Sequence, residues 1–511
     1  MKLQYVPMAH WPPLAWLARC PHGGDSVAVY HGPGVETTDD WFCEAVWDGA
    51  FADGDFDRTD LVFGSGARLR SGVVTFVSAG STVDRLQSLA ADDSLWVSNS
   101  LPCLLAAVDG AVDPAYPRYF ADFASIRLGL ARYRRALATS AGSVRLTYFG
   151  NLVWDGTRLR DQPKPSPARD LSSFARYRGF LESSLQRLAT NLAATDRRRP
   201  YALLGTISSG YDSPTVAALA RDAGLEDAIT FDRSTRGEPD SGAAIAAALG
   251  IRLSVVPHDA WRVTALPEIP FVASDAKGED VYFKGAEAAL AGRVLLTGFH
   301  GDLVWGRGFT PRGFDIVRGD QSGLSLSEYR LGVGFLHCPV PFLGVRQIAE
   351  TQRISRSREM TPWDVDAGYS RPICRRILET AGVPREAFGM RKQTASVLFF
   401  ERGDFLSPPS LADFHSWLER HMPGAGEAAP GLWQAPARAA GRLLDEAARL
   451  SPHRLRLLQS LGTRIGARGR REPLFRYLFP WALERARQRY GSLPEPRARP
   501  EPRPPVGIVD G

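Results

Sequence analysis

The stretch "ALLGTISSGYDSPTVAALA" (202–220) decides the fold of the middle of the chain. Its first six residues are apolar enough for a buried strand, and an apolar helix pattern starts at Pro214. Proline suits the first helical position and serine the N-cap, so Ser213 is the predicted N-cap. The loop 208–213 then offers N–H groups and hydroxyls beside a helix N-terminus, an arrangement that binds anions. Its single acid, Asp212, suits phosphate binding if a divalent cation is also present.

The residues that follow alternate between strand and helix patterns. Strands are expected at 202–207, 229–231, 253–256 and 293–297, and helices at 214–223 and 240–249, each followed by a glycine. This rhythm predicts a doubly wound parallel sheet with helices on both faces. Ligands bind such a sheet at the carboxyl ends of its strands.

A second strand ends in a similar way, in "VLLTGFHGDLVWG" (294–306). Thr297 and Gly298 close the strand, and Asp302 follows four residues later. Because this strand belongs to the same expected sheet, Asp302 supplies a second acid at the same edge.

The rest of the chain has a different pattern. Residues 1–160 read as mostly β, interrupted by one helix expected at 117–138, and residues 400–490 read as mostly helical. A Pro-rich, charged segment follows the β region and precedes an amphipathic helix at 171–194. The expected division is a β-rich domain at 1–160, a linker at 161–172, an α/β domain at 173–490 and a disordered tail at 491–511.

The composition argues against several classes of protein. The 511 residues are 44% hydrophobic and 23% charged, as in globular proteins, and no apolar run could span a membrane. Five scattered cysteines without a C-x-x-C pair favour a reducing, cytoplasmic location. The net charge of +6 is partly concentrated at 464–491. We interpret that segment as an Arg-rich helix face and expect no specific nucleic-acid partner.

Two motifs carry a family resemblance. "ISSGYDS" (207–213) resembles the Ser-Gly-Gly-x-Asp-Ser loop of the PP-loop ATP pyrophosphatases, and "LLTGFHGD" (295–302) with "WG" (305–306) resembles a segment of asparagine synthetases. The chain is thus similar to asparagine synthetase-like enzymes, which include β-lactam synthetase, carbapenam synthetase and lasso-peptide cyclases. The resemblance implies an N-terminal Ntn-hydrolase-like sandwich and a C-terminal PP-loop synthetase domain.

The resemblance also implies a chemistry. ATP adenylates a substrate carboxylate, pyrophosphate leaves, and an amine attacks the acyl-adenylate. Asp212 and Asp302 would coordinate Mg²⁺, and Lys392 in "REAFGMRKQTAS" (385–396) would neutralise the pyrophosphate and the acyl transition state. The residues expected to bind ATP and pyrophosphate are Thr206, Ser208, Ser209, Gly210, Tyr211, Asp212, Ser213, Phe231, Thr297 and Gly298.

The site departs from the family pattern at several positions. Ser209 replaces a glycine, and we expect Ser209→Gly to keep or raise activity. Phe299 and Leu303 replace acids. His300 replaces a glycine and is a candidate base for the attacking amine, with Glu328 and Glu350 as alternatives.

The N-terminal domain departs more strongly. Residue 2 is Lys2 where the family's glutaminase has its nucleophilic cysteine, so we expect a degenerate domain and an amine that does not come from glutamine. The acid and amine remain open among a small metabolite, a peptide and a uronic acid amidated with external ammonia. A non-catalytic nucleotide-binding scaffold and a tRNA-thiolating enzyme are further alternatives. A homodimer is compatible with the sequence.

Overall fold

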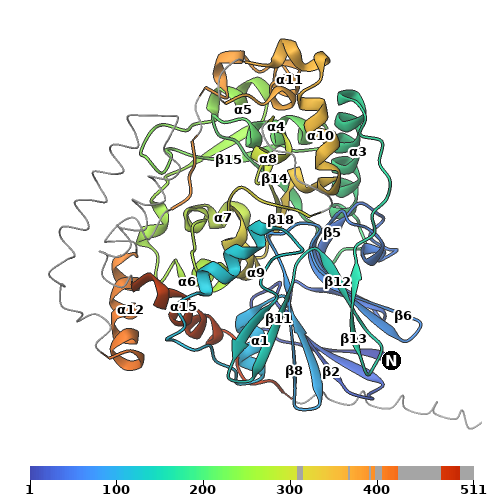
Figure 1. The fold of residues 1–511 in the computed structure, drawn as a ribbon, viewed down its shortest axis with the longest axis vertical. Helices are drawn as coiled ribbons and strands as arrows, with labels where there is room; N and C mark the ends of the chain where they lie inside the picture. Colours follow the sequence, from blue (N-terminus) through green and yellow to red (C-terminus); the bar gives the residue numbers. More distant parts are fainter. Residues whose placement is uncertain (308–314, 366–368, 391–392, 398–405, 424–473, 495–511) are drawn as a thin grey trace, which may run out of the picture.

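The computed structural model has a mixed α/β fold (Figure 1) and describes residues 1–307, 315–365, 369–390, 393–397, 406–423 and 474–494. No helix in these ranges is long and apolar enough to cross a membrane. The structure contains a parallel sheet and two largely antiparallel sheets, joined by helices and short 3-10 turns.

Two sheets built from the first 163 residues pack face to face. One has the order β1 (Lys2–Pro7), β3 (Ser26–His31), β2 (Trp16–Pro21), β9 (Ser94–Ser98), β8 (Leu86–Ala91), β11 (Gly142–Thr147), β10 (Ala136–Thr139). The other has the order β13 (Leu159–Pro163), β12 (Gly150–Trp154), β7 (Val73–Val77), β6 (Val62–Arg70), β5 (Trp41–Trp47), β4 (Glu36–Thr37). Trp16 of the first sheet packs edge-on against Phe42 of the second, with ring centroids 5.1 Å apart, inside a shared apolar core.

The expected helix at 117–138 is mostly wrong. The chain forms α2 (Tyr119–Ala124) and a short 3-10 turn, and then Gly129 turns it with φ +97°. Residues 136–139 become β10, paired antiparallel with β11. Cross-strand pairing with β11 therefore overrides the helix-forming tendency of this segment.

The predicted parallel sheet is confirmed. Its strand order is β16 (Arg252–Val256), β15 (Asp227–Phe231), β14 (Ala202–Thr206), β17 (Arg293–Thr297), β18 (Leu336–Pro339), and all its pairs are parallel. The chain runs outward from β14 to β16 and then returns to β17 on the other side of β14. This reversal opens a crevice beyond the carboxyl ends of β14 and β17.

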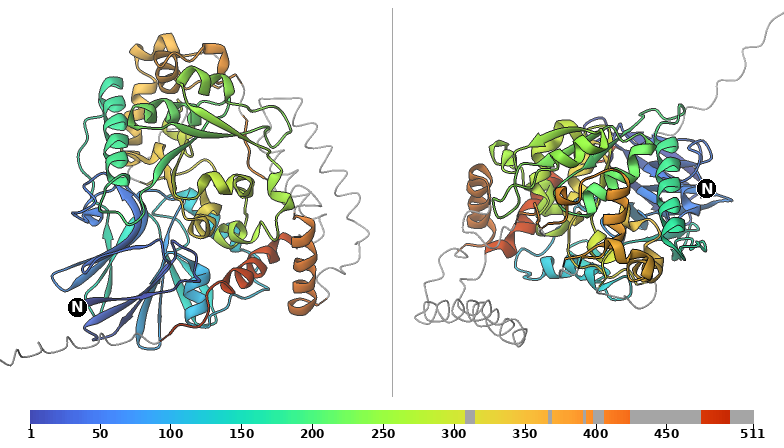
Figure 2. Two further views of the ribbon diagram at one scale, coloured as in Figure 1. Left: turned by 180° about the vertical axis from the view of Figure 1, so that it is seen from behind. Right: turned by 90° about the horizontal axis from the view of Figure 1, so that it is seen from above.

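Helices cover both faces of the parallel sheet (Figures 1 and 2). Leu203 belongs to one apolar cluster and its neighbour Leu204 to the other, because side chains alternate along a strand. The first face carries α3 (Phe174–Leu192), α4 (Asp212–Ala220), α5 (Ala243–Leu249), α10 (Ile348–Ser355) and α11 (Pro372–Thr380). The second carries α6 (Ile269–Asp275), α7 (Glu287–Leu290) and α9 (Ser327–Val333). Beyond them, α15 (Leu478–Arg487) packs on α6, and α12 (Pro408–His421) packs on α15. The described residues also form α1 (Leu101–Ala107), after β9, and α8 (Gly301–Val304), after β17.

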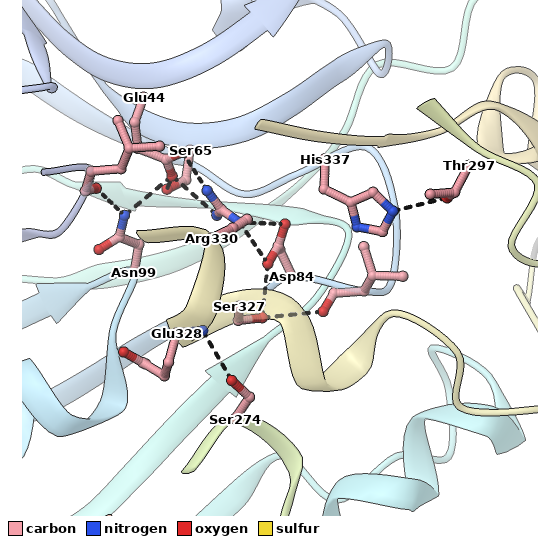
Figure 3. Close-up of polar contacts among 12 residues, drawn as sticks. Glu44, Ser65, Asp84, Asn99, Ser274, Thr297, Ser327, Glu328, Arg330 and His337 are labelled. Carbon is pink, nitrogen blue, oxygen red and sulfur yellow. Dashed lines mark hydrogen bonds and ion pairs between the residues drawn. The ribbon is translucent and has the colours of Figure 1, made fainter. Parts of the chain in front are cut away.

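A buried polar network joins the N-terminal sheets to α9 (Figure 3). The Arg330 guanidinium donates to Glu44 Oε2 at 2.6 Å and to both carboxylate oxygens of Asp84, at 3.0 and 3.1 Å. Ser65 and Asn99 donate to the other Glu44 oxygen. All three charged side chains are almost fully buried, so the N-terminal sheets and the parallel-sheet region are held together through paired charges.

Candidate functional site

The two predicted strand-end motifs lie against each other. β14 and β17 are neighbours, so Thr206 and Thr297 end at the same edge of the sheet. A side chain on Gly298 would place its Cβ 2.6 Å from the Cβ of Asp212, and one on Gly301 would place its Cβ 2.7 Å from the Asp212 Cγ. The glycines of the second motif are therefore needed for its close approach to the acid of the first.

The loop after β14 is closed by its own hydroxyl groups. The Ser208 N–H donates to Ser213 Oγ at 3.1 Å, and the two serine hydroxyls lie 3.0 Å apart. The Gly210 N–H donates to Ser208 Oγ at 3.3 Å. Helix α4 begins at Asp212 with Tyr211 in the N-cap position, so the predicted N-cap Ser213 is wrong. Ser213 lies inside the first turn, and its hydroxyl shapes the loop.

A cavity of about 200 Å³ opens at these strand ends. Ten of the residues expected from the sequence line it: Thr206, Ser208, Gly210, Tyr211, Asp212, Ser213, Phe231, Gly298, His300 and Asp302. Ser209 and Thr297 are not among the lining residues, and Thr297 Oγ1 is 2.9 Å from His337 Nε2 (Figure 3). Lys392 lies outside the described residues.

Acidic and basic groups share the polar end of the cavity. Asp212 forms an ion pair with Arg371, the residue that precedes α11. Desolvation raises the pKa of Asp212 although Arg371 opposes the shift, and the nearby Asp302 and Asp320 raise it further. Asp302 and Asp320 also line the cavity. A cation or a positively charged group is therefore favoured beside these carboxylates.

The residues fit a magnesium ion only together with a phosphate ligand. Within the described ranges, no group of three or more His, Cys, Asp or Glu side chains is arranged to hold a metal. Mg²⁺ commonly takes only one or two carboxylates and completes its shell with substrate phosphates and water. Asp212 and Asp302, which face one cavity, are a donor set of that kind.

His300 is buried, with a strained backbone conformation and a shifted pKa. Its φ is +74°, in the left-handed region that favours glycine, and its ring stacks on Phe342 with centroids 4.9 Å apart. Burial, assisted by Arg318, lowers the pKa of His300 to about 3. Neither ring nitrogen has a hydrogen-bond partner among the described residues. The low pKa argues against the expected role as a base, whereas a neutral imidazole can hydrogen-bond a bound ligand.

The other end of the cavity is aromatic. Phe231 packs edge-on against Tyr282 and Phe283, with ring centroids 4.7 and 5.4 Å apart, and Phe299 continues the wall. Phe299 thus contributes an apolar surface. A flat ring or an apolar substituent fits this end best.

Of the two segments that flank Arg391 and Lys392, one contacts the loop after β14 and the other lines the cavity. The Gly389 N–H donates to the Ser209 carbonyl at 2.8 Å, before these two residues. Gln393 to Ser396, which follow them, line the cavity, and the Thr394 carbonyl accepts from the Thr235 N–H at 2.7 Å. Both flanks of the predicted lysine position are thus anchored to the site.

The alternative bases are not placed to act in this cavity. Glu328 is buried on α9, where Ser100 donates to its carboxylate at 2.9 Å. It is absent from the described lining of the cavity, as is Glu350 on α10. All five cysteines are buried and free, and burial raises the pKa of Cys43 to about 12. Such thiols are poor nucleophiles.

Sequence reasoning missed three charged residues of the cavity: Asp240, Asp320 and Arg371. Asp240 follows "GEP" and precedes the Ala-rich α5, a position that resembles an ordinary helix start. Arg371 precedes Pro372 at the start of α11 and is more than 150 residues away from Asp212 in sequence. Only the tertiary contacts identify them.

Comparison of the sequence with protein-family models and with curated proteins gives no match. The two motifs and the geometry of the cavity are therefore the features that bear on the function of the protein.

Proposed function

We propose that this protein is an ATP- and Mg²⁺-dependent, AMP-forming ligase that joins a carboxylate to an amine, with the fold of the asparagine synthetase-like enzymes. The observation that carries the proposal is the meeting of two strand-end motifs, each with one aspartate, at the reversal point of a parallel sheet. Nucleotide phosphates bind at such places. The N-terminal sheets would be the degenerate glutaminase-like domain.

Each part of the cavity has a task in this mechanism. The loop 207–211 and the N-terminus of α4 would bind the β- and γ-phosphates, and Asp212 and Asp302 would hold the magnesium ion. That ion supplies charge neutralisation for the phosphates. Arg371, with Lys392 as the second candidate cation, would stabilise the negative charge that develops on the departing pyrophosphate.

The acyl group of the substrate is bonded first to AMP and then to the amine. A carboxylate oxygen of the substrate attacks the α-phosphorus, the bond from that phosphorus to the bridging oxygen breaks, and pyrophosphate leaves. The amine nitrogen then attacks the acyl carbon, loses a proton, and AMP leaves. The aromatic wall of Tyr282, Phe283 and Phe299 favours an acid with a ring or an apolar group near its carboxylate.

ATP–pyrophosphate exchange with a panel of carboxylic acids tests this proposal. We expect exchange that depends on one class of acid and on Mg²⁺, and no exchange with the Asp212→Ala variant. ATP-dependent release of ADP instead of AMP would contradict the adenylation mechanism.

A nucleotide-binding scaffold without catalysis is the second candidate. The ion pair between Asp212 and Arg371 favours this alternative, because the arginine binds the carboxylate that would otherwise coordinate the metal. Tight ATP binding with neither exchange nor AMP release in the presence of acids and amines would select this alternative.

A further inference from the structure

Ser209, the residue that departs from the family's glycine, is held at three atoms. Its N–H and its hydroxyl both donate to the same oxygen of Asp240, at 3.0 and 2.6 Å. Its carbonyl accepts from the Gly389 N–H at 2.8 Å. Both donors of Ser209 are therefore directed at Asp240, which lines the cavity, whereas Ser209 itself is not among the lining residues.

Asp240 is itself fixed against β15, the neighbour of the strand that precedes the loop. It is 7% exposed, and the Thr230 hydroxyl lies 3.4 Å from its backbone carbonyl. Two residues later, a Cβ on Gly242 would lie 2.7 Å from the Ile207 carbonyl oxygen, so this segment packs directly on the start of the loop. Because the backbone of Asp240 is held in this way, its carboxylate can define where Ser209 lies.

The other contact of Ser209 leads toward the predicted lysine. A Cβ on Gly389 would lie 2.7 Å from the Tyr211 hydroxyl, and Arg375 of α11 donates to that hydroxyl at 2.6 Å. The segment that ends at Met390 is thus fastened to the loop through both Ser209 and Tyr211. Anything that displaces Ser209 also releases a contact of this segment.

We infer that Asp240 is a positioning residue: its carboxylate takes both donors of Ser209 and so sets the phosphate-binding loop and the attached 385–390 segment in one arrangement. The consequence for catalysis rests on the proposed function. The positioning itself does not, because the contacts belong to the protein without ligand. Ser209→Gly is therefore expected to weaken ATP use, in contrast to the expectation from the sequence.

The test compares Asp240→Ala, which removes the acceptor, with Asp240→Asn, which keeps an oxygen acceptor in the same place. Asp240→Ala is expected to raise the KM for ATP in pyrophosphate exchange about 10-fold, because it removes two hydrogen bonds to a charged acceptor. Asp240→Asn should stay within about threefold of wild type, because the amide oxygen can accept both bonds. Asp227→Asn, at the opposite end of β15, is the matched control and should leave the KM unchanged.

A double-mutant cycle isolates the pair. Ser209→Ala removes the hydroxyl bond and keeps the N–H bond, so it should raise the KM less than Asp240→Ala does. In the Asp240→Ala background, Ser209→Ala should have almost no further effect. The positioning role would be overturned if Ser209→Ala raised the KM for ATP by the same factor in the wild-type and Asp240→Ala proteins. It would also be overturned if Asp240→Asn raised the KM as much as Asp240→Ala does.

Amide hydrogen exchange of the ligand-free protein separates this inference from the proposed function. Asp240→Ala should speed exchange of the Ser209 and Gly389 amides at least 10-fold, whereas Asp240→Asn and Asp227→Asn should not. If the wild-type protein shows no ATP–pyrophosphate exchange, the proposed function fails. The amide hydrogen exchange rates still show whether Asp240 positions the loop. Unchanged amide exchange in Asp240→Ala would overturn the inference.

Discussion

Arg371 is the cation that the structure adds to the site. It is 6% exposed at its side chain, and Asp212 is its ionic partner. Since a bidentate guanidinium binds phosphate strongly, we predict that Arg371→Ala raises the KM for ATP about 10-fold or more, with a smaller effect for Arg371→Lys. Initial rates of pyrophosphate exchange at varied ATP measure this. Equal kinetics for Arg371→Ala and wild type would exclude a phosphate-binding role.

Glu328 gives the protein a pH dependence of a defined sign. Burial raises the pKa of Glu328 to about 7, and the Ser100 hydrogen bond, Arg85 and Arg489 only partly oppose the shift. Between about pH 4.5 and 7 the folded state thus binds more protons at this group than the unfolded state, so stability falls as the pH rises.

We predict that Glu328→Gln, which keeps the acceptor for Ser100, raises the free energy of unfolding at pH 8 by about 1–3 kcal/mol. Its advantage should disappear near pH 4.5. Urea denaturation of both proteins at several pH values measures the difference. A constant difference across this pH range would contradict the assigned pKa.

The contact between the loop before α4 and the loop before α8 makes a further prediction. Gly301→Ala would place a Cβ 2.7 Å from the Asp212 Cγ, so one of the two loops must move. We expect a loss of about 1–3 kcal/mol in stability and at least a 10-fold loss of exchange activity. Gly179→Ala is the control: its Cβ has open space on the exposed face of α3, and it should stabilise the helix slightly. Full activity in Gly301→Ala would show that the loops do not need this approach.

The elements differ in how well the sequence predicts them. β17 has the predicted bounds, because its apolar run is flanked by a charge and a Thr-Gly pair. The predictions of α3 and of helix ends at Gly224 and Gly250 also agree with the structure, since the amphipathic pattern and the glycines that indicate them are local features of the sequence. The helix expected at 117–138 fails because its end pairs with β11, a strand that no local pattern connects to it. Asp240 and Arg371 were missed for the same reason, since their roles depend on distant partners.

Arg330 is one of several links between the N-terminal sheets and the rest of the described structure. Its guanidinium pairs with Glu44 of β5 and with Asp84, which precedes β8, so one α9 side chain joins the parallel-sheet region to both N-terminal sheets. We predict that Arg330→Ala destabilises the protein by about 3–5 kcal/mol, because it leaves two buried carboxylates without their partner.

Arg252→Ala is the matched control for that prediction. Arg252 also pairs with two acids, Glu226 and Asp227, but it is 69% exposed, so its loss should cost less than about 1 kcal/mol. Chemical denaturation of both variants measures the costs. Equal small costs would mean that the buried network does not hold the two parts together.

The transfer of oxygen from the acid to the nucleotide tests the adenylation most directly. The acid that supports pyrophosphate exchange is labelled with ¹⁸O in its carboxylate and is incubated with ATP, Mg²⁺ and an amine until the amide forms. We predict one ¹⁸O atom in the phosphate group of AMP for each amide bond. Label in inorganic phosphate, with ADP as the nucleotide product, would contradict the account.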